Sequence, residues 1–377
     1  MGRRNGIRRA GALGLILALS PLSACSPDSD TPQVLDGWQS VALPPGVAAS
    51  SIAIQDRTVL IGGYLEEGSS RAPFLARIRP DDSDPRAERV PLTPTTPYGK
   101  VANLTSLTAS GDEIVALGAA RGGAHANVRW TIWTGGSDRL TDRPQAFETF
   151  GGWDAGTLLG VATDRRGPLV VGTWQGTHGP DGAIWRAEAE RWQREPTDAA
   201  LANTSDRQVG PRTVDQQTDG SVVVSGSVID LGAGVHQQAA FWRDVAGAWA
   251  LTMLTDPGRR SDTWSTACAQ TCWSVGARDD SLAVWSGRVR QQIPALPVAD
   301  KDSGRVLLGD DRAVVVASTR GTGRLLIGRG GRWHSYSAPD GTVLAAALLG
   351  ARLLLLTDAD PTAGRLWTRD LTDVLDR

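Results

Sequence analysis

The sequence predicts an all-β fold, specifically a seven-bladed β-propeller closed by an N-terminal strand. A short apolar run rich in β-forming residues recurs along the chain, and further short strands separated by turn residues follow each run. Beyond the first 24 residues, the apolar side chains do not show the 3.6-residue spacing that a helical solenoid would require. These observations together favour a ring of four-stranded sheets.

The repeated run begins at a polar turn, often with Asp, and ends at a small residue. The closing residues of successive copies lie 55, 54, 54, 50, 42 and 39 positions apart, which is the spacing of propeller blades. The seven copies occupy residues 56–63, 112–118, 164–172, 219–226, 270–276, 311–318 and 350–357.

Tryptophan marks the strands that follow most of these runs. The expected third strands carry Trp133, Trp185, Trp242, Trp285 and Trp367, and some fourth strands open with Trp192, Trp249 or Trp333. The first copy has Phe74–Ile78 in place of a Trp strand. Large flat side chains at repeating positions suit the packing of neighbouring sheets, so we expect the tryptophans to lie between blades.

The seventh copy lacks a recognisable fourth strand. It offers strands at 343–349, 352–357 and 364–368. Near the N-terminus, residues 37–44 are similar to residues 331–339, which are the expected fourth strand of the sixth copy. We therefore predict that 37–44 completes the seventh blade and removes the open sheet edges of a propeller spanning 34–377.

The first 24 residues have the features of an export signal. An apolar stretch at 10–20 follows the basic start, and its eleven residues are far fewer than the ~20 that a membrane-spanning helix needs. The basic start consists of Arg3, Arg4, Arg8 and Arg9.

The run Leu22-Ser23-Ala24-Cys25 directly after this stretch resembles the lipobox of bacterial lipoproteins. The resemblance implies cleavage before Cys25, removal of 1–24, and a diacylglycerol on the Cys25 sulfur. It also implies a location on the extracytoplasmic face of the cell membrane. Residues 25–33, rich in Ser, Pro and Asp, would form a flexible tether. The alternative is an ordinary secretory signal with an unrelated cysteine.

The charge balance limits the classes of partner. Residues 1–24 contain four Arg and no acidic residue, so their removal changes the formal net charge from −2 to −6. A mildly acidic chain has no electrostatic reason to bind nucleic acid and would be repelled by anionic lipid headgroups. Membrane attachment therefore depends on the acyl chains. We expect a monomer without a cofactor or a bound metal.

Cys268 and Cys272 remain once Cys25 is assigned to the lipid. An even pair in an exported chain predicts a disulfide, here across a short turn between two strands. A metal site is the alternative, but no further Cys follows and no His is nearby.

The segments 184–192 and 241–249 are similar to worn copies of the Asp-box, a repeat of sialidase-like and related secreted propellers. This resemblance implies a secreted β-propeller. No copy keeps the full Ser-x-Asp-x-Gly-x-x-Trp order. A sialidase would need an arginine triad and a Tyr nucleophile with an acidic partner. Tyr64, which is followed by Glu66 and Glu67, is the candidate for such a nucleophile. The sialidase signature Arg-Ile-Pro is absent, because residues 77–80 read Arg-Ile-Arg-Pro.

Candidate ligand-binding residues fall in the long connections between the first and fifth copies. In a propeller, the connections between blades and the loops between second and third strands emerge on one face, and long loops there favour a binding role. Three histidines precede successive third-strand tryptophans by eight, seven and six residues. If they converge, they could hold a metal; otherwise they are surface residues. The candidates are His125, His178, His236, Tyr98, Trp153, Arg259 and Trp264.

The function that these features favour is a non-catalytic module. We expect a membrane-anchored propeller that binds or scaffolds an envelope protein or glycan, since a rigid disc with variable loops suits recognition. The alternatives are a glycan-processing, glycosidase-like propeller and an envelope assembly factor.

The lipid anchor can be tested directly. The variant Cys25→Ala should appear in the soluble exported fraction, because the acyl chains are the only membrane attachment that the sequence offers. Fractionation with detergent extraction measures this. Continued partition of the variant with membranes would contradict the anchor at Cys25.

Overall fold

The computed structural model describes residues 33–68, 70–80, 85–122, 127–189, 191–232, 234–245, 247–309, 312–360 and 363–375. The predicted export signal, Cys25 and His125 lie outside these ranges. The described residues belong to one compact unit that begins at Pro32. Within this unit, no helix is long and apolar enough to cross a membrane.

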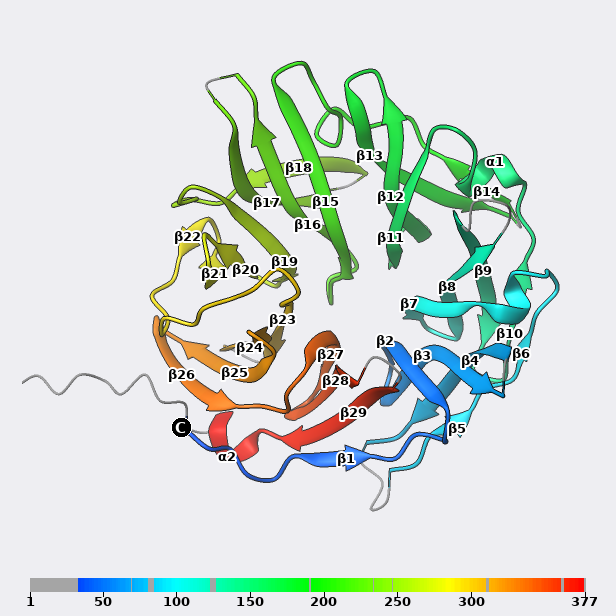
Figure 1. Ribbon diagram of the computed structural model, residues 1–377, viewed down its shortest axis with the longest axis horizontal. Coiled ribbons are helices and arrows are strands. Elements are labelled where there is room, and N and C mark those ends of the chain that lie inside the picture. The colour runs from blue at the N-terminus through cyan, green and yellow to red at the C-terminus, as the bar shows by residue number, and fades with distance from the viewer. Residues whose placement is uncertain are drawn as a thin grey trace, which may run out of the picture. The chain divides into compact units, whose positions relative to one another are not determined.

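Seven antiparallel sheets surround a common axis and form the predicted seven-bladed β-propeller (Figure 1). The first blade contains β2 (Val47–Gln55), β3 (Thr58–Glu67), β4 (Ser70–Ile78) and β5 (Glu88–Arg89). The second contains β7 (Asn103–Ser110), β8 (Glu113–Gly122), β9 (Asn127–Gly136) and β10 (Arg139–Arg143), and β6 (Leu92–Thr93) pairs with β10 in parallel. The third contains β11 (Ala155–Asp164), β12 (Gly167–Gly176), β13 (Gly179–Glu188) and β14 (Arg191–Arg194).

The remaining blades follow the same order from the axis outward. The fourth contains β15 (Arg207–Gln216), β16 (Val222–Asp230), β17 (His236–Val245) and β18 (Ala248–Met253). The fifth contains β19 (Ser261–Cys268), β20 (Cys272–Arg278), β21 (Ser281–Ser286) and β22 (Val289–Arg290). The sixth contains β23 (Gly304–Gly309), β24 (Arg312–Thr319), β25 (Thr322–Arg329) and β26 (Arg332–Ser337). The seventh contains β27 (Thr342–Leu349), β28 (Arg352–Asp360), β29 (Ala363–Asp370) and β1 (Gln39–Val41).

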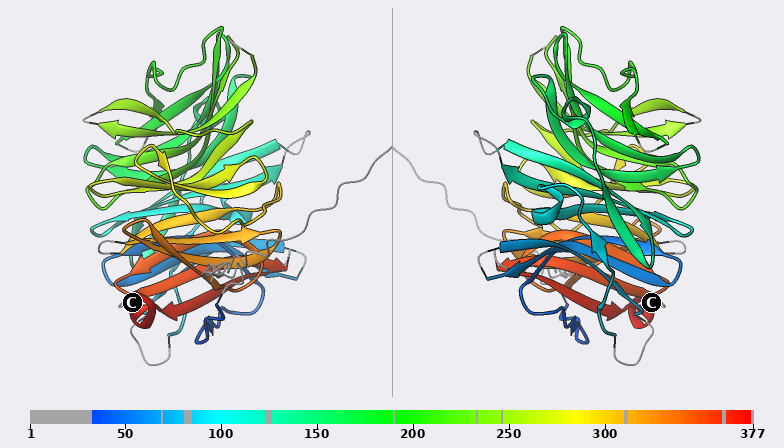
Figure 2. Two further views of the ribbon diagram at one scale, coloured as in Figure 1. Left: turned by 90° about the vertical axis from the view of Figure 1, so that its left-hand side faces the viewer. Right: turned by 90° about the vertical axis from the view of Figure 1, so that its right-hand side faces the viewer.

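Three short helical turns complete the fold. They are η1 (Gly99–Val101), α1 (Phe147–Phe150) and α2 (Thr372–Leu375). Side views show the blades as stacked, tilted sheets whose turns and connections emerge at the two faces of the ring (Figure 2).

The predicted closure of the ring through the N-terminus is confirmed. β1 lies antiparallel to β29, with Gln39 opposite Thr368 and Val41 opposite Leu366. The segment before β1 also contacts the sixth blade, because the Gln33 N–H donates to the Ser335 carbonyl at 3.0 Å. The N-terminal segment therefore joins the sixth and seventh blades.

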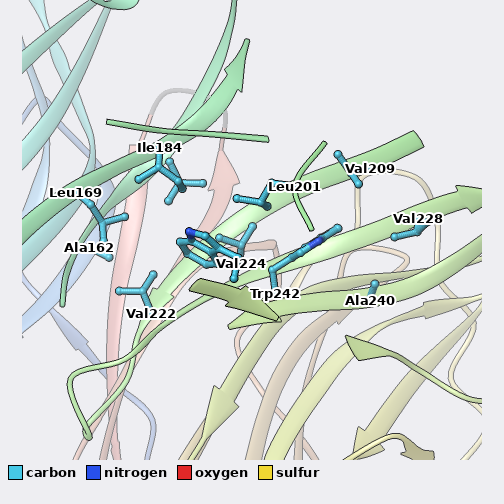
Figure 3. Close-up of a cluster of buried hydrophobic side chains, with 12 residues drawn as sticks. Ala162, Leu169, Ile184, Leu201, Val209, Val222, Val224, Val228, Ala240 and Trp242 are labelled. Carbon is cyan, nitrogen blue, oxygen red and sulfur yellow. The ribbon is translucent and has the colours of Figure 1, made fainter. Parts of the chain in front are cut away.

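A buried apolar cluster fills each of the seven junctions between neighbouring blades within the described residues. The third-strand tryptophans lie in four of these junctions, as the repeat predicts, and each is at most 1% exposed: Trp133, Trp185, Trp242 and Trp285. Figure 3 shows one such cluster, in which Trp242 lies beside Leu201 and Val224.

The buried indoles also fix the connections between blades. In three blades the tryptophan Nε1–H donates to a carbonyl in the preceding connection: Trp185 to Thr149 at 2.8 Å, Trp242 to Ala200 at 2.8 Å and Trp285 to Thr255 at 3.0 Å. A buried N–H without a partner would cost free energy, so these bonds hold the connection and the blade in one arrangement.

Hydroxyl groups on the innermost strands, or directly before one, link neighbouring blades. The Ser51 hydroxyl donates to the Leu104 carbonyl at 2.8 Å, the Thr213 hydroxyl to the Trp264 carbonyl at 2.8 Å, and the Ser303 hydroxyl to the Val343 carbonyl at 2.6 Å. The register shifts in the innermost strands of six blades, which is typical of β-bulges.

The predicted disulfide is confirmed. Cys268 ends β19, Cys272 begins β20, and their sulfurs are bonded across the turn at 269–271. The Cα atoms lie 3.9 Å apart.

An ionic cluster joins the third and fourth blades. The Asp164 carboxylate accepts both Nη groups of Arg186, at 3.0 and 2.5 Å, and the Arg166 N–H at 2.8 Å. The cluster also contains Asp244, whose carboxylate lies 3.5 Å from Arg166 Nη2, and Glu195, 3.0 Å from Arg186 Nε. Three acidic groups therefore share two guanidinium groups in a site where the Asp164 and Asp244 side chains are only 4% and 6% exposed.

The two aspartates respond to this site in opposite ways. Burial opposes the ionisation of Asp164, but the hydrogen bonds, above all from Arg186, outweigh it and lower its pKa. Burial raises the pKa of Asp244, and the neighbouring Asp164 carboxyl raises it further. Asp164 therefore stabilises the fold above its ordinary pKa, and this contribution is lost as the pH falls through its lowered value. As the pH rises through the raised pKa of Asp244, ionisation of this group lowers the free energy of unfolding.

Ring closure can be tested with two adjacent residues of β1. Val41→Asp should lower the melting temperature by roughly 5 °C or more, because it places a carboxylate in the apolar junction between the seventh and first blades. Ser40→Asp, at the exposed neighbouring position, is the matched control and should change little. Thermal unfolding followed by circular dichroism measures both. Equal, small effects would show that closure does not depend on β1.

The ionic cluster predicts opposite results for two isosteric substitutions. Asp164→Asn should destabilise the protein at pH 7 by about 3 kcal/mol, because it removes the carboxylate that pairs with both Nη groups of the buried Arg186 and leaves Glu195 as its close ionic partner. Asp244→Asn should stabilise it at pH 7, because it removes a charge whose ionisation the site opposes. Denaturant unfolding should show both differences shrinking toward pH 3. Destabilisation by both substitutions at pH 7 would contradict the assignment.

Candidate functional site

A pocket of about 330 Å³ opens at the second blade, on the face that carries the connections between blades. Its walls come from the connection before β7, the start of β9, the end of β10 and the connection that leads to β11. In an antiparallel blade these four segments emerge on the same side, so the pocket lies on the face where the sequence predicts binding. Its aromatic and charged lining residues are Tyr98, Trp130, Phe147, Phe150, Arg129, Arg143 and Asp142.

One wall is built around Asp142 at the end of β10. Its Oδ2 accepts the Thr96 N–H at 3.0 Å and the Thr96 hydroxyl at 2.5 Å, which ties the first connection to the second blade. Gly99 permits this approach, because a Cβ there would lie 2.2 Å from Asp142 Oδ2. The ring of Tyr98 rests on Gly122 in the same way, since a Cβ at Gly122 would lie 2.4 Å from Tyr98 Cε1.

The opposite wall is α1, which the third blade holds in place. The Trp185 indole donates to the Thr149 carbonyl, and its ring meets Phe150 edge-on at 5.9 Å between centroids. Phe147, on the same turn, is 55% exposed. The pocket therefore has a rigid, buried base at Phe150 and an exposed aromatic edge at Phe147.

Two charged groups of the pocket lack ionic partners. The Arg129 Cζ lies 5.0 Å from the centre of the Phe147 ring, and Arg129 forms no ion pair with any described residue. Asp142 is 1% exposed, and its second carboxylate oxygen, Oδ1, has no hydrogen-bond partner among the described residues. A buried carboxylate oxygen without a donor costs free energy, so this oxygen calls for a donor that the described protein atoms do not supply.

Exposed apolar side chains gather around the same pocket. Nine large apolar side chains of the described residues are exposed, and four of them line the pocket or lie within three residues of its lining: Val101, Val128, Phe147 and Trp153. An apolar rim around a concave site is typical of a ligand-binding surface.

The structure places the predicted site residues as follows. Tyr98 lines the pocket, and Trp153 is fully exposed in the connection two residues beyond the pocket residue Gly151. His178 lies in the turn between β12 and β13, and His236 opens β17; both are exposed. Arg259 is exposed and lies 3.7 Å from the Asp279 carboxylate. His125 lies outside the described residues.

The placement of Trp264 in a loop is wrong. Trp264 belongs to β19, is 3% exposed, and packs in the junction between the fifth and sixth blades. The register of β19 shifts between Thr263 and Ser265, so Trp264 sits at a bulge that directs its ring into this junction. Its ring is therefore not free to stack on a ligand.

The structure also places the residues on which the sialidase-like alternative depends, and it bears on the metal alternative. Tyr64 and Glu66 both face Arg71, whose Cζ lies 4.3 Å from the Tyr64 ring centre and whose Nη2 lies 3.4 Å from Glu66 Oε1. Within the described ranges, no group of three or more His, Cys, Asp or Glu side chains is arranged to hold a metal ion.

Sequence reasoning missed most of the pocket. Trp130, Arg129 and Asp142 were not predicted, and neither was the aromatic pair of α1. One pattern could have found Trp130: Trp130 and Trp133 lie three positions apart in one strand, so they point to opposite faces and both cannot fill the same junction. Phe147 and Phe150 carry no comparable mark, because their role depends on the position of the third blade.

A larger hollow of about 710 Å³ lies along β1. Its lining, from residues 39–44, 85–87 and Thr368, contains no aromatic side chain and one charged side chain, Arg86. It offers fewer groups for recognition than the pocket at the second blade.

Comparison with solved structures shows the fold. The chain is similar to the β-propeller domain of the Trilobed protease from Pyrococcus furiosus, with a TM-score of 0.50 and 10% identity over 88% of this chain and 97% of that one. It is similar to the polysaccharide lyase Uly1, with a TM-score of 0.51 and 10% identity over 93% and 94% of the two chains. A protein from Lactobacillus plantarum gives a TM-score of 0.51 and 13% identity over 85% and 94%. No family model and no curated protein matches the chain.

Proposed function

We propose that this protein is a lipid-tethered, extracytoplasmic β-propeller that binds a glycan of the cell envelope in the pocket at the second blade. The observation that carries the proposal is the composition of that pocket: four aromatic rings, two guanidinium groups and a buried carboxylate with an unpartnered oxygen. Aromatic faces pack against the C–H face of a sugar ring, and the charged groups bind its polar substituents.

The dimensions of the site favour a glycan over a protein partner. A volume of about 330 Å³ is at the small end of ligand pockets. A stable protein interface buries about 800 Å² on each partner and is usually built around a broad surface. Here the exposed apolar side chains are few and surround a concavity, which suits a chain of sugar units that enters with one or two residues.

The lining favours binding over hydrolysis. Asp142 is the single carboxylate among the pocket-lining residues, and Thr96 already engages one of its oxygens. Glycoside hydrolysis generally uses two carboxyl groups placed on either side of the scissile bond. The pocket therefore supports recognition of a glycan, with the propeller as a rigid support.

The tether and the export of the chain rest on the sequence. The lipobox-like run at 22–25 supports a lipid anchor at Cys25. The disulfide between Cys268 and Cys272 supports residence in an oxidising compartment, because such bonds are rare in the cytosol. A glycan of the envelope would be within reach of a protein held at that surface.

The pocket can be tested with soluble protein that carries Cys25→Ala. Affinity electrophoresis through gels containing bacterial envelope polysaccharides should show retardation, and Phe147→Ala should weaken the affinity about tenfold, or ~1.4 kcal/mol. Because Phe147 is largely exposed, its removal should leave the melting temperature unchanged.

Val235→Ala is the control, since Val235 is exposed on the fourth blade. It should not change the affinity. Retardation that is insensitive to Phe147→Ala would place the glycan elsewhere. Absence of retardation by all polysaccharides, together with an envelope protein that binds this face, would favour the assembly role instead.

A further inference from the structure

The pocket contains an arginine that the rest of the fold does not neutralise. Many guanidinium groups of this protein meet a carboxylate, as Arg77 meets Glu88 and Arg243 meets Asp219. Arg129 differs: across the described part of the chain, neither a carboxylate nor any other acceptor takes a hydrogen bond from it. Its guanidinium Cζ lies over the face of Phe147, 5.0 Å from the ring centre.

This contact places the guanidinium group of Arg129 over the Phe147 ring and pairs none of its N–H groups with a hydrogen-bond acceptor. A guanidinium that lies over an aromatic face is held by cation–π attraction, while its N–H groups remain in its own plane. Such a group is prepared to receive a carboxylate or phosphate through two parallel hydrogen bonds. Phe147 thus positions Arg129 at the pocket without neutralising it.

The charge of Arg129 makes the pocket unfavourable for a cationic ligand. Arg143 also lines the pocket, where its Nε donates to the Thr134 hydroxyl at 2.9 Å. The lining contains two guanidinium groups and one carboxylate, that of Asp142. A ligand with an ammonium group would be repelled by Arg129, which no carboxylate of the described residues neutralises.

Asp142 adds a second requirement. Its Oδ1 has no hydrogen-bond donor among the described residues, and neither an ionised carboxylate nor a fully ionised phosphate group can supply one. A sugar hydroxyl can. A ligand that suits this lining carries an anionic group for Arg129 and a C–H face for the aromatic rings, and its hydroxyl groups match the carboxylate of Asp142.

From this combination we infer that the ligand is an anionic saccharide, a glycan in which a sugar unit bears a carboxylate or phosphate group that pairs with Arg129. The inference rests on the proposed function, because it names the class of glycan that the same pocket takes. A carboxylate and a phosphate group would both pair with a guanidinium group, and the experiment below distinguishes between them.

The experiment compares charged and neutral forms of the same probe on the full chain carrying Cys25→Ala. Oligogalacturonate and its methyl ester form the carboxylate pair, and phosphomannan and mannan form the phosphate pair. In 50 mM salt, titration calorimetry should show at least tenfold tighter binding of the charged member of one pair. The pair that shows it identifies the anionic group, and 500 mM salt should reduce the difference.

The variants test whether Arg129 is responsible. Arg129→Gln should remove the preference for the charged probe, and Arg129→Lys should keep only part of it, because an ammonium lacks the paired N–H groups. Arg332→Gln, an equal change of charge at an exposed position of the sixth blade, should keep the full preference. Melting temperatures should confirm that all three variants fold.

The outcomes separate the two proposals. Equal affinity for charged and neutral probes, lost in both cases on Phe147→Ala, would overturn the anionic class and leave glycan binding intact. A preference for the charged probe that survives Arg129→Gln would also overturn the inference. Failure of every saccharide probe to bind would overturn this inference and the proposed function together.

Discussion

Closure of the ring is the constraint on which the rest of this structure depends. Each blade buries an apolar surface on both sides, so a blade without a neighbour would expose one of its junction clusters to water. The three-residue β1 prevents this at the seventh blade by pairing with β29 and burying Val41 in the junction with the first blade. A few residues near the N-terminus thus stabilise contacts that lie more than 300 positions away, and Gln33 extends the same support to the sixth blade.

The junctions also determine where the candidate site can form. The pocket belongs to the second blade, but Trp185 of the third blade holds α1 through the Thr149 carbonyl and packs against Phe150. The first connection reaches the site through Thr96, which binds Asp142. The site is therefore supported from three successive blades. A site that is fixed in this way can present Phe147 of α1 and Arg129 of β9 to a ligand with little loss of conformational entropy.

Charge inside the ring follows the same division between support and recognition. At the junction of the third and fourth blades, Asp164 and Arg186 neutralise each other in a buried setting, and the excess carboxyl group, Asp244, has its pKa raised. At the pocket, Arg129 has no ionic partner among the described residues, and Oδ1 of Asp142 has no hydrogen-bond donor among them. Groups that satisfy each other hold blades together, whereas groups that do not are suited to bind a partner from outside.

The sequence by itself determined the features that repeat or that are local. The recurring apolar runs give seven blades, the tryptophans mark the junctions, the similarity of 37–44 to 331–339 predicts the closing strand, and Cys268 and Cys272 are close enough along the chain to predict their bond. Only the tertiary structure decided the site. Trp264 and Trp153 both interrupt the repeat, yet a bulge buries the first and a connection exposes the second. Arg129, Asp142 and Phe147 come from different segments, and their meeting depends on packing between blades, which repeat spacing does not encode.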